Sequence, residues 1–218
     1  MIDDFAAITP INFFQLSADC RQMVDWKPEN FPYLGKKNFQ KYLLPDTSAL
    51  CGEAFFAEVA MGWCTDGLEA YVVVNHPFRR AVYPDVERGD SVELFIDTRD
   101  VKTSGFNTRF CHHVFFLAEG VEGHFAGEKT HFRTEDIHPL CDPNDLKIKV
   151  SNKSDHYSLN IFIPKHCLHG YDPEQFNRLG FTYRINQANG VPQHFSVVTE
   201  DYQIEQQPSL WGSLKLLR

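Results

Sequence analysis

The 218-residue sequence predicts an all-β protein, an antiparallel β-sandwich or jelly roll with little helix. Short apolar runs alternate with polar residues at a period of two, which is the pattern of strands with one buried face. Gly, Pro, Asn and Asp residues separate these runs, and almost no stretch shows the period of an amphipathic helix. We expect most of the 19 phenylalanines to lie between two packed sheets.

The first strong signal is a hairpin between residues 54 and 75. Odd-numbered positions from Phe55 to Trp63 (AFFAEVAMGW) are apolar, so we expect them on one buried face. Residues 65–67 (TDG) suit a tight turn, and residues 68–75 (LEAYVVVN) are typical of the returning strand.

Later strands follow the same pattern. They are predicted at residues 91–97, 109–117, 146–150, 157–163, 179–186, 194–198 and 213–217. Between them, only residues 165–178 are expected to hold a short helix or turn. Residues 1–50 are Pro-rich and less periodic, and we expect them to wrap the sandwich as loops and an edge strand. The prediction is therefore one domain, 1–218, with its core sandwich in 51–218.

The charge of the chain bears on its partners. With 21 basic and 29 acidic residues the net charge is -8, which repels phosphate backbones and anionic lipid surfaces. The N-terminal sequence MIDDFAAITPINFF has acidic residues where a secretory signal peptide has basic ones. No apolar run approaches the length needed to span a bilayer. We therefore expect no nucleic-acid or membrane partner, and a cytoplasmic location.

The cysteines are spread over the chain and form no CxxC pair, so neither a zinc ribbon nor a disulfide framework is indicated. They are Cys20, Cys51, Cys64, Cys111, Cys141 and Cys167. In a cytoplasmic protein we expect them to be reduced and mostly buried.

Two adjacent histidines, His112 and His113, lie on the predicted strand 109–117. Neighbouring residues of a strand point to opposite faces, so the two side chains do not readily share one metal ion. We expect one of them to be a core histidine and the other to lie at the surface or in a pocket.

The remaining metal-ligand candidates are weaker. His124, His131 and His138 are evenly spaced, but the spacing suits neither a strand face nor a zinc motif, so they are expected in loops. The acidic residues of 97–100 (DTRD) are compatible with a structural calcium site, but we favour the interpretation that they form a turn. No metal site or cofactor is otherwise predicted.

Residues 89–97 (GDSVELFID) resemble the signature D-S-x-E-(I/L)-F-(I/L)-D of family 9 carbohydrate-binding modules. The family pattern continues in order through residues 66–74 (DGLEAYVVV), 157–164 (YSLNIFIP), 179–186 (LGFTYRIN) and 208–216 (PSLWGSLKL). The resemblance covers about residues 50–218. It implies the DOMON-like β-sandwich of that superfamily, in agreement with the strand periodicity.

The resemblance implies a non-catalytic module that binds a small neutral saccharide or glycan. Such a site needs an aromatic face for the C–H side of the sugar ring and polar groups for its hydroxyls. Carried over by position, the polar binding residues are Glu93, His113 and Arg184, with His112 as the alternative alignment for the histidine.

The sequence departs from the family at its aromatic clamp. The family holds its sugar between two tryptophans, and neither matching position is tryptophan here. Arg88 stands at the first position with Tyr83 nearby, and Tyr202 lies where the second is expected, so we expect a tyrosine platform. Trp63 and Trp211 are predicted to lie in the core.

The sequence is compatible with other functions as well. A fold does not decide a function, so one alternative is a cytosolic enzyme or metal-dependent protein on the same scaffold. In this alternative, one site is formed by His112, His113, Glu93 and Arg184. An interaction module that uses a sheet face or edge is a further alternative. The sequence contains no GxSxG, HExxH, phosphate-loop or catalytic-cysteine motif, which leaves standard hydrolases, metalloproteases and kinases without support.

Overall fold

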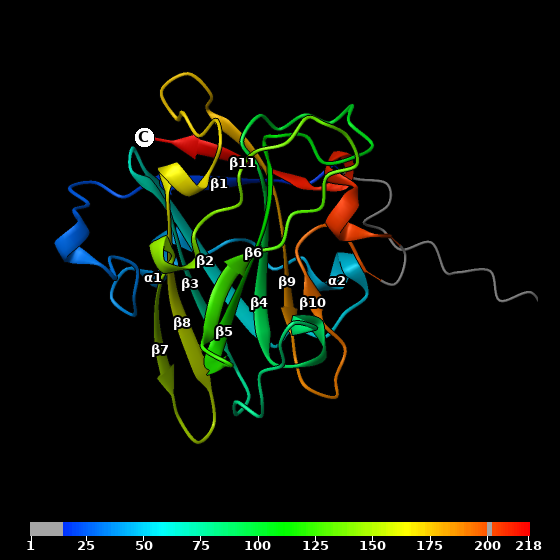
Figure 1. Cartoon of the computed structure of the whole chain (residues 1–218). Coiled ribbons are helices and arrows are strands. Elements are labelled where there is room, and N and C mark those ends of the chain that lie inside the picture. The colour runs from blue at the N-terminus through cyan, green and yellow to red at the C-terminus, as the bar shows by residue number, and fades with distance from the viewer. Residues whose placement is uncertain (1–14, 200–201) are drawn as a thin grey trace, which may run out of the picture.

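The computed structural model describes residues 15–199 and 202–218 (Figure 1), and within these residues the regular secondary structure is mainly β-strand. The strands are β1 (Ser17–Gln22), β2 (Ala57–Cys64), β3 (Gly67–Val74), β4 (Ser91–Asp97), β5 (Cys111–Val121), β6 (His124–Glu128), β7 (Lys147–Asn152), β8 (Tyr157–Pro164), β9 (Arg178–Asn186), β10 (Gln193–His194) and β11 (Gly212–Leu217). Two one-turn helices, α1 (Phe39–Tyr42) and α2 (Ser48–Cys51), and several 3₁₀ turns complete the described chain. The prediction of an all-β fold with little helix is confirmed.

The strands form one continuous sheet in the order β6-β5-β4-β9-β11-β1-β2-β3-β8-β7, with β10 paired to β9. The sheet curves back on itself as a nearly closed, barrel-like sandwich, and β11 and β1 connect its two halves across the top of the view in Figure 1. The main core lies between the half built on β4, β5 and β9 and the half built on β2, β3 and β8.

The predicted hairpin is confirmed as β2 and β3, joined by Thr65 and Asp66. Gly67 follows the turn with a φ of +150°, and a Cβ there would lie 2.2 Å from the carbonyl oxygen of Ile163. Only glycine fits this approach of two strands. Phe55 was predicted on the buried face but is 48% exposed, because it precedes the first paired residue of β2.

The prediction of a purely antiparallel sheet with an N-terminal edge strand is wrong at β1. This strand lies between β11 and β2 and runs parallel to both. Residues 23–56 cross over between β1 and β2, which allows both strands to run in the same direction. Residues 1–14 of the predicted wrap lie outside the described residues. Strand β6, which the sequence pattern did not predict, forms the edge beside β5.

Connecting segments cover the outer faces of both halves of the sheet. Between β1 and β2, Met23, Leu34, Phe39 and Tyr42 pack on the outer face of β2, β3 and β8. On the other half, Trp211 packs with Val197, Ile204 and Phe95, and Val86 packs with Phe115 and Leu117. Trp63 and Trp211 are both buried, as predicted. The outer face of β4, β5 and β9 is therefore a second, smaller interior.

The prediction that all six cysteines are reduced is wrong for two of them. Cys141 and Cys167 form a disulfide, whereas Cys20, Cys51, Cys64 and Cys111 are free and buried. The two partners are 26 residues apart, and the fold brings their Cα atoms to 4.8 Å. Disulfides are typical of oxidising compartments, so the cysteines no longer support the expected cytoplasmic location.

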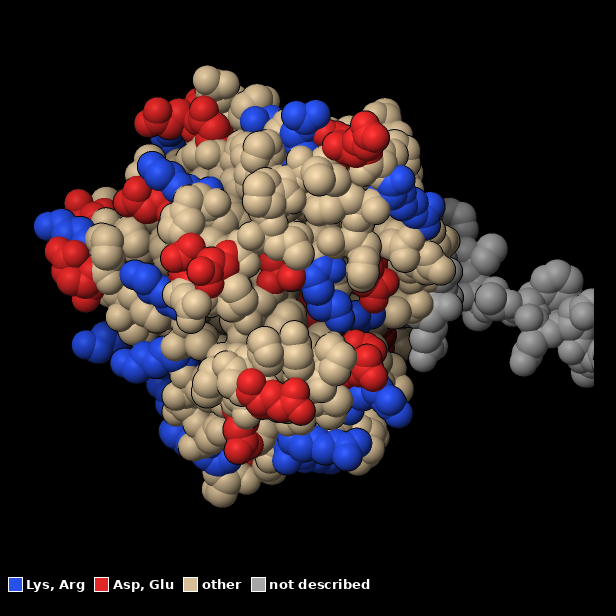
Figure 2. All heavy atoms as spheres, viewed as in Figure 1, with Lys and Arg blue, Asp and Glu red and all other residues tan. Residues whose placement is uncertain are grey.

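Within the described residues, no helix has the length and apolar character needed to cross a bilayer. Acidic and basic side chains alternate over the face seen in Figure 2, without a large area of one sign.

Candidate functional site

The candidate site lies on the outer face of the neighbouring strands β4, β5 and β9. Glu93 of β4 pairs in register with Arg184 of β9, and Phe95 of β4 pairs with His113 of β5. Alternation along each strand places Glu93, Arg184 and His113 on the side opposite to the main core. Three of the residues that the resemblance indicates are thus brought together from distant parts of the chain.

Glu93 is the centre of a hydrogen-bonded cluster. Its Oε2 accepts a hydrogen bond from Nε2 of His113 at 2.7 Å, and its Oε1 accepts from Nε of Arg184 at 2.8 Å. The Oε1 atom also accepts from Nδ2 of Asn186 at 2.7 Å. Both carboxylate oxygens are therefore engaged by groups from β5 and β9.

Burial and charge define the protonation of this cluster. Glu93, His113 and Arg184 are 0%, 1% and 3% exposed. Burial alone would raise the pKa of Glu93, but hydrogen bonding to His113 and the Arg184 guanidinium outweigh it and hold the pKa far below its usual range. Burial lowers the pKa of His113, which suits a neutral ring that donates from Nε2. The centre is an ion pair between Glu93 and Arg184.

Charged residues connect this buried centre to the surface. Arg184 also contacts Glu205, whose carboxylate lies 2.8 Å from Nη1 and is 26% exposed. On another side, Nζ of Lys129 lies 3.8 Å from Glu93 and 3.6 Å from Glu87. Lys129, Glu87 and Glu205 form the polar rim of the site.

The two predicted tyrosine platforms differ in their surroundings. The ring of Tyr83 stacks on His124 at 4.1 Å and packs at a tilt on Phe115, so its position is defined by β5 and β6. Tyr202 is 36% exposed, and its backbone N–H donates to the carbonyl of Val198.

His112 does not belong to this cluster. It points to the opposite side of β5, so the convergence of His112 with Glu93, His113 and Arg184 in one enzyme or metal site is wrong. Both adjacent histidines are buried, so the expectation of a core histidine is met and the surface alternative for the other is wrong, whereas the pocket alternative stays a prediction. Asn186 could have been identified from the sequence, because it shares the parity of Arg184 on β9. Lys129 and Glu205 carried no sequence signal.

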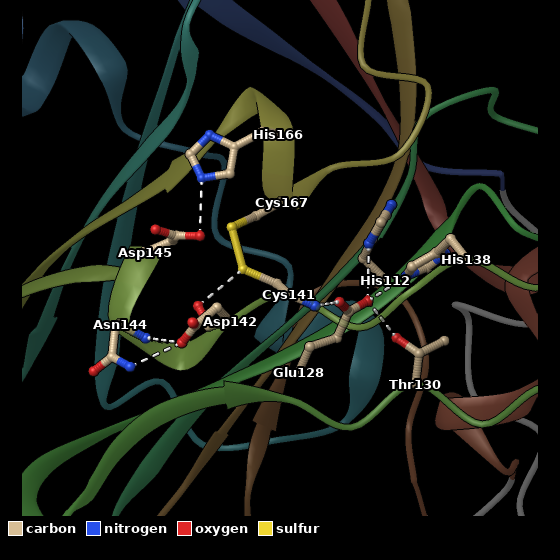
Figure 3. Close-up of a disulfide and its surroundings, with 10 residues drawn as sticks. All are labelled: His112, Glu128, Thr130, His138, Cys141, Asp142, Asn144, Asp145, His166 and Cys167. Carbon is tan, nitrogen blue, oxygen red and sulfur yellow. Dashed lines mark hydrogen bonds and ion pairs between the residues drawn. A yellow bond between two sulfur atoms is a disulfide. The ribbon is translucent and has the colours of Figure 1, made fainter.

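His112 belongs instead to a second buried cluster, centred on Glu128 (Figure 3). Its Nδ1 lies 2.9 Å from Oε1 of Glu128, and Nε2 of His138 lies 2.8 Å from the same oxygen. Thr130 donates to Oε1 as well, and the backbone N–H of Cys141 donates to Oε2. His138 was predicted as a loop residue, and it is in a loop, but it is 5% exposed and points inward.

The Glu128 cluster also offers a set of metal-ligand atoms. One atom each of His112, Glu128 and His138 lies within 4.8 Å of the others. In this structure these atoms hydrogen-bond one another, and hydrogen bonds from the two histidines outweigh burial to hold the pKa of Glu128 far below its usual range. The arrangement is that of a buried hydrogen-bonded network that attaches the 129–145 segment to β5, in which Nε2 of His112 has no hydrogen-bond partner among the described residues.

The acidic turn after β4 is bonded internally. Asp97 accepts hydrogen bonds from the backbone N–H groups of Arg99 and Val101. Asp100 has a φ of 52° and contacts Lys102 and Ser213. These contacts are those of turn-forming acids, the interpretation favoured over a calcium site.

Comparison with proteins of known structure identifies the type of fold. No protein-family model matches the sequence, and no curated protein matches it. A family 9 carbohydrate-binding module from Caldicellulosiruptor kristjanssonii in complex with cellotriose superposes with a TM-score of 0.55 and 19% identity, over 74% of each chain. Its complex with glucose gives a TM-score of 0.57 and 20% identity, over 74% of this chain and 77% of the other.

A third solved structure covers more of the chain. It is described as a putative carbohydrate-binding protein from Bacteroides uniformis and matches with a TM-score of 0.53 and 10% identity, over 92% of this chain and 98% of the other. At these identities the likeness establishes the architecture. The chain therefore has the fold of family 9 carbohydrate-binding modules.

Proposed function

We propose that this protein is a non-catalytic carbohydrate-binding module for a small neutral saccharide. The proposal is supported by the likeness of its fold to modules solved with cellotriose and glucose. The observation that carries it is the Glu93, His113 and Arg184 cluster, which stands on one face of three neighbouring strands. These are the residues that the sequence resemblance indicates for sugar binding.

Within this proposal, Glu93 positions the other groups. Both of its oxygens already accept hydrogen bonds, so it holds Arg184 and His113 in place. Hydroxyl groups of the saccharide contact the polar rim, where Lys129 donates and Glu87 and Glu205 accept. Tyr83, fixed by its stacking on His124, supplies the aromatic face, and Tyr202 a second one.

The electrostatics of Glu93 favour binding over hydrolysis. Glycoside hydrolysis uses one carboxyl group with a raised pKa as general acid, beside a second carboxylate. Glu93 has its pKa shifted in the opposite direction by His113 and Arg184, so it is unsuited to donate a proton at neutral pH.

Calorimetric titration of the full chain with glucose and with cellotriose tests the proposal. We expect binding at millimolar affinity or tighter, weakened at least about threefold by Lys129→Ala or by Tyr83→Ala. Tyr33→Ala is a matched control, because Tyr33 packs edge-on against Tyr42 beside the other half of the sheet. Folded protein without affinity for any neutral saccharide at millimolar concentration would overturn the function. Equal effects of Tyr83→Ala and Tyr33→Ala would overturn the site.

A further inference from the structure

Two cysteines joined by the disulfide, a histidine and an aspartate, all residue types that bind metals, lie close together (Figure 3). The Nε2 atom of His166 lies 3.1 Å from Oδ2 of Asp145. Ligand atoms of Asp145, His166 and Cys167 all lie within 4.8 Å of one another, and Cys141 is bonded to Cys167. These four residues line a cavity of about 200 Å³ together with His138, Asp142 and His169.

The backbone positions of these groups are set by contacts other than the disulfide. The N–H of Cys141 donates to the buried carboxylate of Glu128 at 2.8 Å. Asp142 caps the 3₁₀ turn η4 (Pro143–Asp145) by accepting from the N–H of Asn144 at 2.9 Å. The second 3₁₀ turn, η5 (Lys165–Cys167), directly follows β8. Opening the disulfide therefore leaves both turns anchored.

The site is also open to reagents. The side chains of His166 and Asp145 are 61% and 47% exposed, and Cys141 is half-buried at the cavity. A small thiol can reach the disulfide there. In the exchange, two thiols of the reductant are oxidised to one disulfide, and Cys141 and Cys167 each gain a proton and an electron as free thiols.

We propose that the reduced protein binds Zn²⁺ through Cys141, Cys167, His166 and Asp145. Two thiolates, one imidazole and one carboxylate are a donor set that zinc accepts in tetrahedral geometry. Binding replaces the two thiol protons by the metal ion and needs the sulfur atoms to separate to about 3.8 Å, the spacing of two ligands with Zn–S bonds of about 2.3 Å. The disulfide and the metal use the same sulfur atoms, so oxidation excludes zinc.

Zinc content measured in two redox states tests this site. The full chain is reduced with a phosphine, which unlike a thiol does not leave competing sulfur ligands, and freed of reductant under anaerobic conditions. We expect one equivalent of Zn²⁺ in the reduced protein and none at the same free zinc concentration in the oxidised protein. Co²⁺ in place of zinc should give the intense sulfur-to-cobalt charge-transfer band of thiolate ligation.

Variants assign the ligands. Loss of an outer-shell partner weakens metal binding about 10–100-fold, so removal of a direct ligand by His166→Ala or Cys141→Ser should weaken it by at least about 100-fold. His156→Ala is the matched control, since His156 also pairs with an aspartate, Asp155, at 2.7 Å but in the turn between β7 and β8. It should leave the affinity unchanged.

Three outcomes would overturn the proposal. They are equal zinc content in the oxidised and reduced protein, a cobalt complex without a thiolate band, and zinc binding that survives His166→Ala but is lost in His138→Gln. The last result would assign the metal to the buried Glu128 cluster instead.

Discussion

Arg184 and Glu93 form an ion pair inside the protein, with Nε of the arginine 2.8 Å from Oε1 of the glutamate and both side chains almost fully buried. The residues are 91 positions apart in the chain and directly opposite each other in neighbouring strands. Glu205, His113 and Asn186 complete the hydrogen bonding of the pair. Removing one partner of a buried ion pair leaves an uncompensated charge in the interior. The free-energy cost of that charge is much larger than the net stabilisation that the intact pair provides.

Arg184→Met should therefore destabilise the protein strongly. The variant leaves Glu93 without the buried guanidinium, with the part-exposed Lys129 at 3.8 Å as a remaining cation, and we expect the free energy of unfolding to fall by about 3–5 kcal/mol. Denaturation in urea at pH 7 measures the loss. In the double variant Arg184→Met with Glu93→Gln the charge is removed too, and part of the loss should be recovered. A loss below about 1 kcal/mol in the single variant would contradict a buried pair.

Acid should destabilise the protein through Glu128 and Glu93. Both carboxyl groups have a folded-state pKa below the ordinary value of 4.5, so their contribution is complete above about pH 4.5 and is lost as the pH falls below it. The free energy of unfolding, measured between pH 6 and pH 3 in wild type and in Glu128→Gln, should fall less steeply in the variant. Parallel curves would show that Glu128 does not titrate in this way.

Glu69 should have the opposite effect on the pH dependence and make the protein less stable as the pH rises. It lies under the segment between β1 and β2, where burial raises its pKa to about 7, against the hydrogen bonds that it accepts from the N–H groups of Leu34 and Trp26. A raised folded-state pKa means that stability is full below about pH 4.5 and is lost as the pH rises through 7. Between pH 5 and 7 wild type should lose up to about 1.4 kcal/mol per pH unit relative to Glu69→Gln. Urea midpoints of both proteins measured at half-unit steps give this difference, and a constant difference would disprove it.

The disulfide should stabilise the fold in the absence of metal. It closes a loop between residues 26 positions apart, for which the chain-entropy relation gives about 3.5 kcal/mol. We expect Cys141→Ser with Cys167→Ser to lower the free energy of unfolding by about this amount when a chelator is present. Cys111→Ser, at a free buried cysteine, controls for the loss of a thiol. A phosphine reductant should destabilise wild type but not the double variant.

Local sequence patterns account for a large part of the fold. The period-two pattern placed β4 at its observed limits and identified the β2–β3 hairpin, because alternation is a property of each strand by itself. The same alternation puts Glu93 and Phe95 on one face of β4 without knowledge of any neighbour. The pattern missed β6, a short edge strand that follows Gly123 of the preceding turn and contains Gly127, because glycine has a low strand propensity.

The sequence alone determined the strand parities, the all-β class and the motif that resembles family 9 modules. The tertiary structure decided which strands are neighbours: it placed β1 between β11 and β2, Arg184 opposite Glu93, and Cys141 against Cys167. These contacts join residues far apart in the chain, and their formation depends on how the whole sheet curves and closes. A local pattern shows which way a side chain points from its strand, whereas only the assembled sheet shows what it meets there.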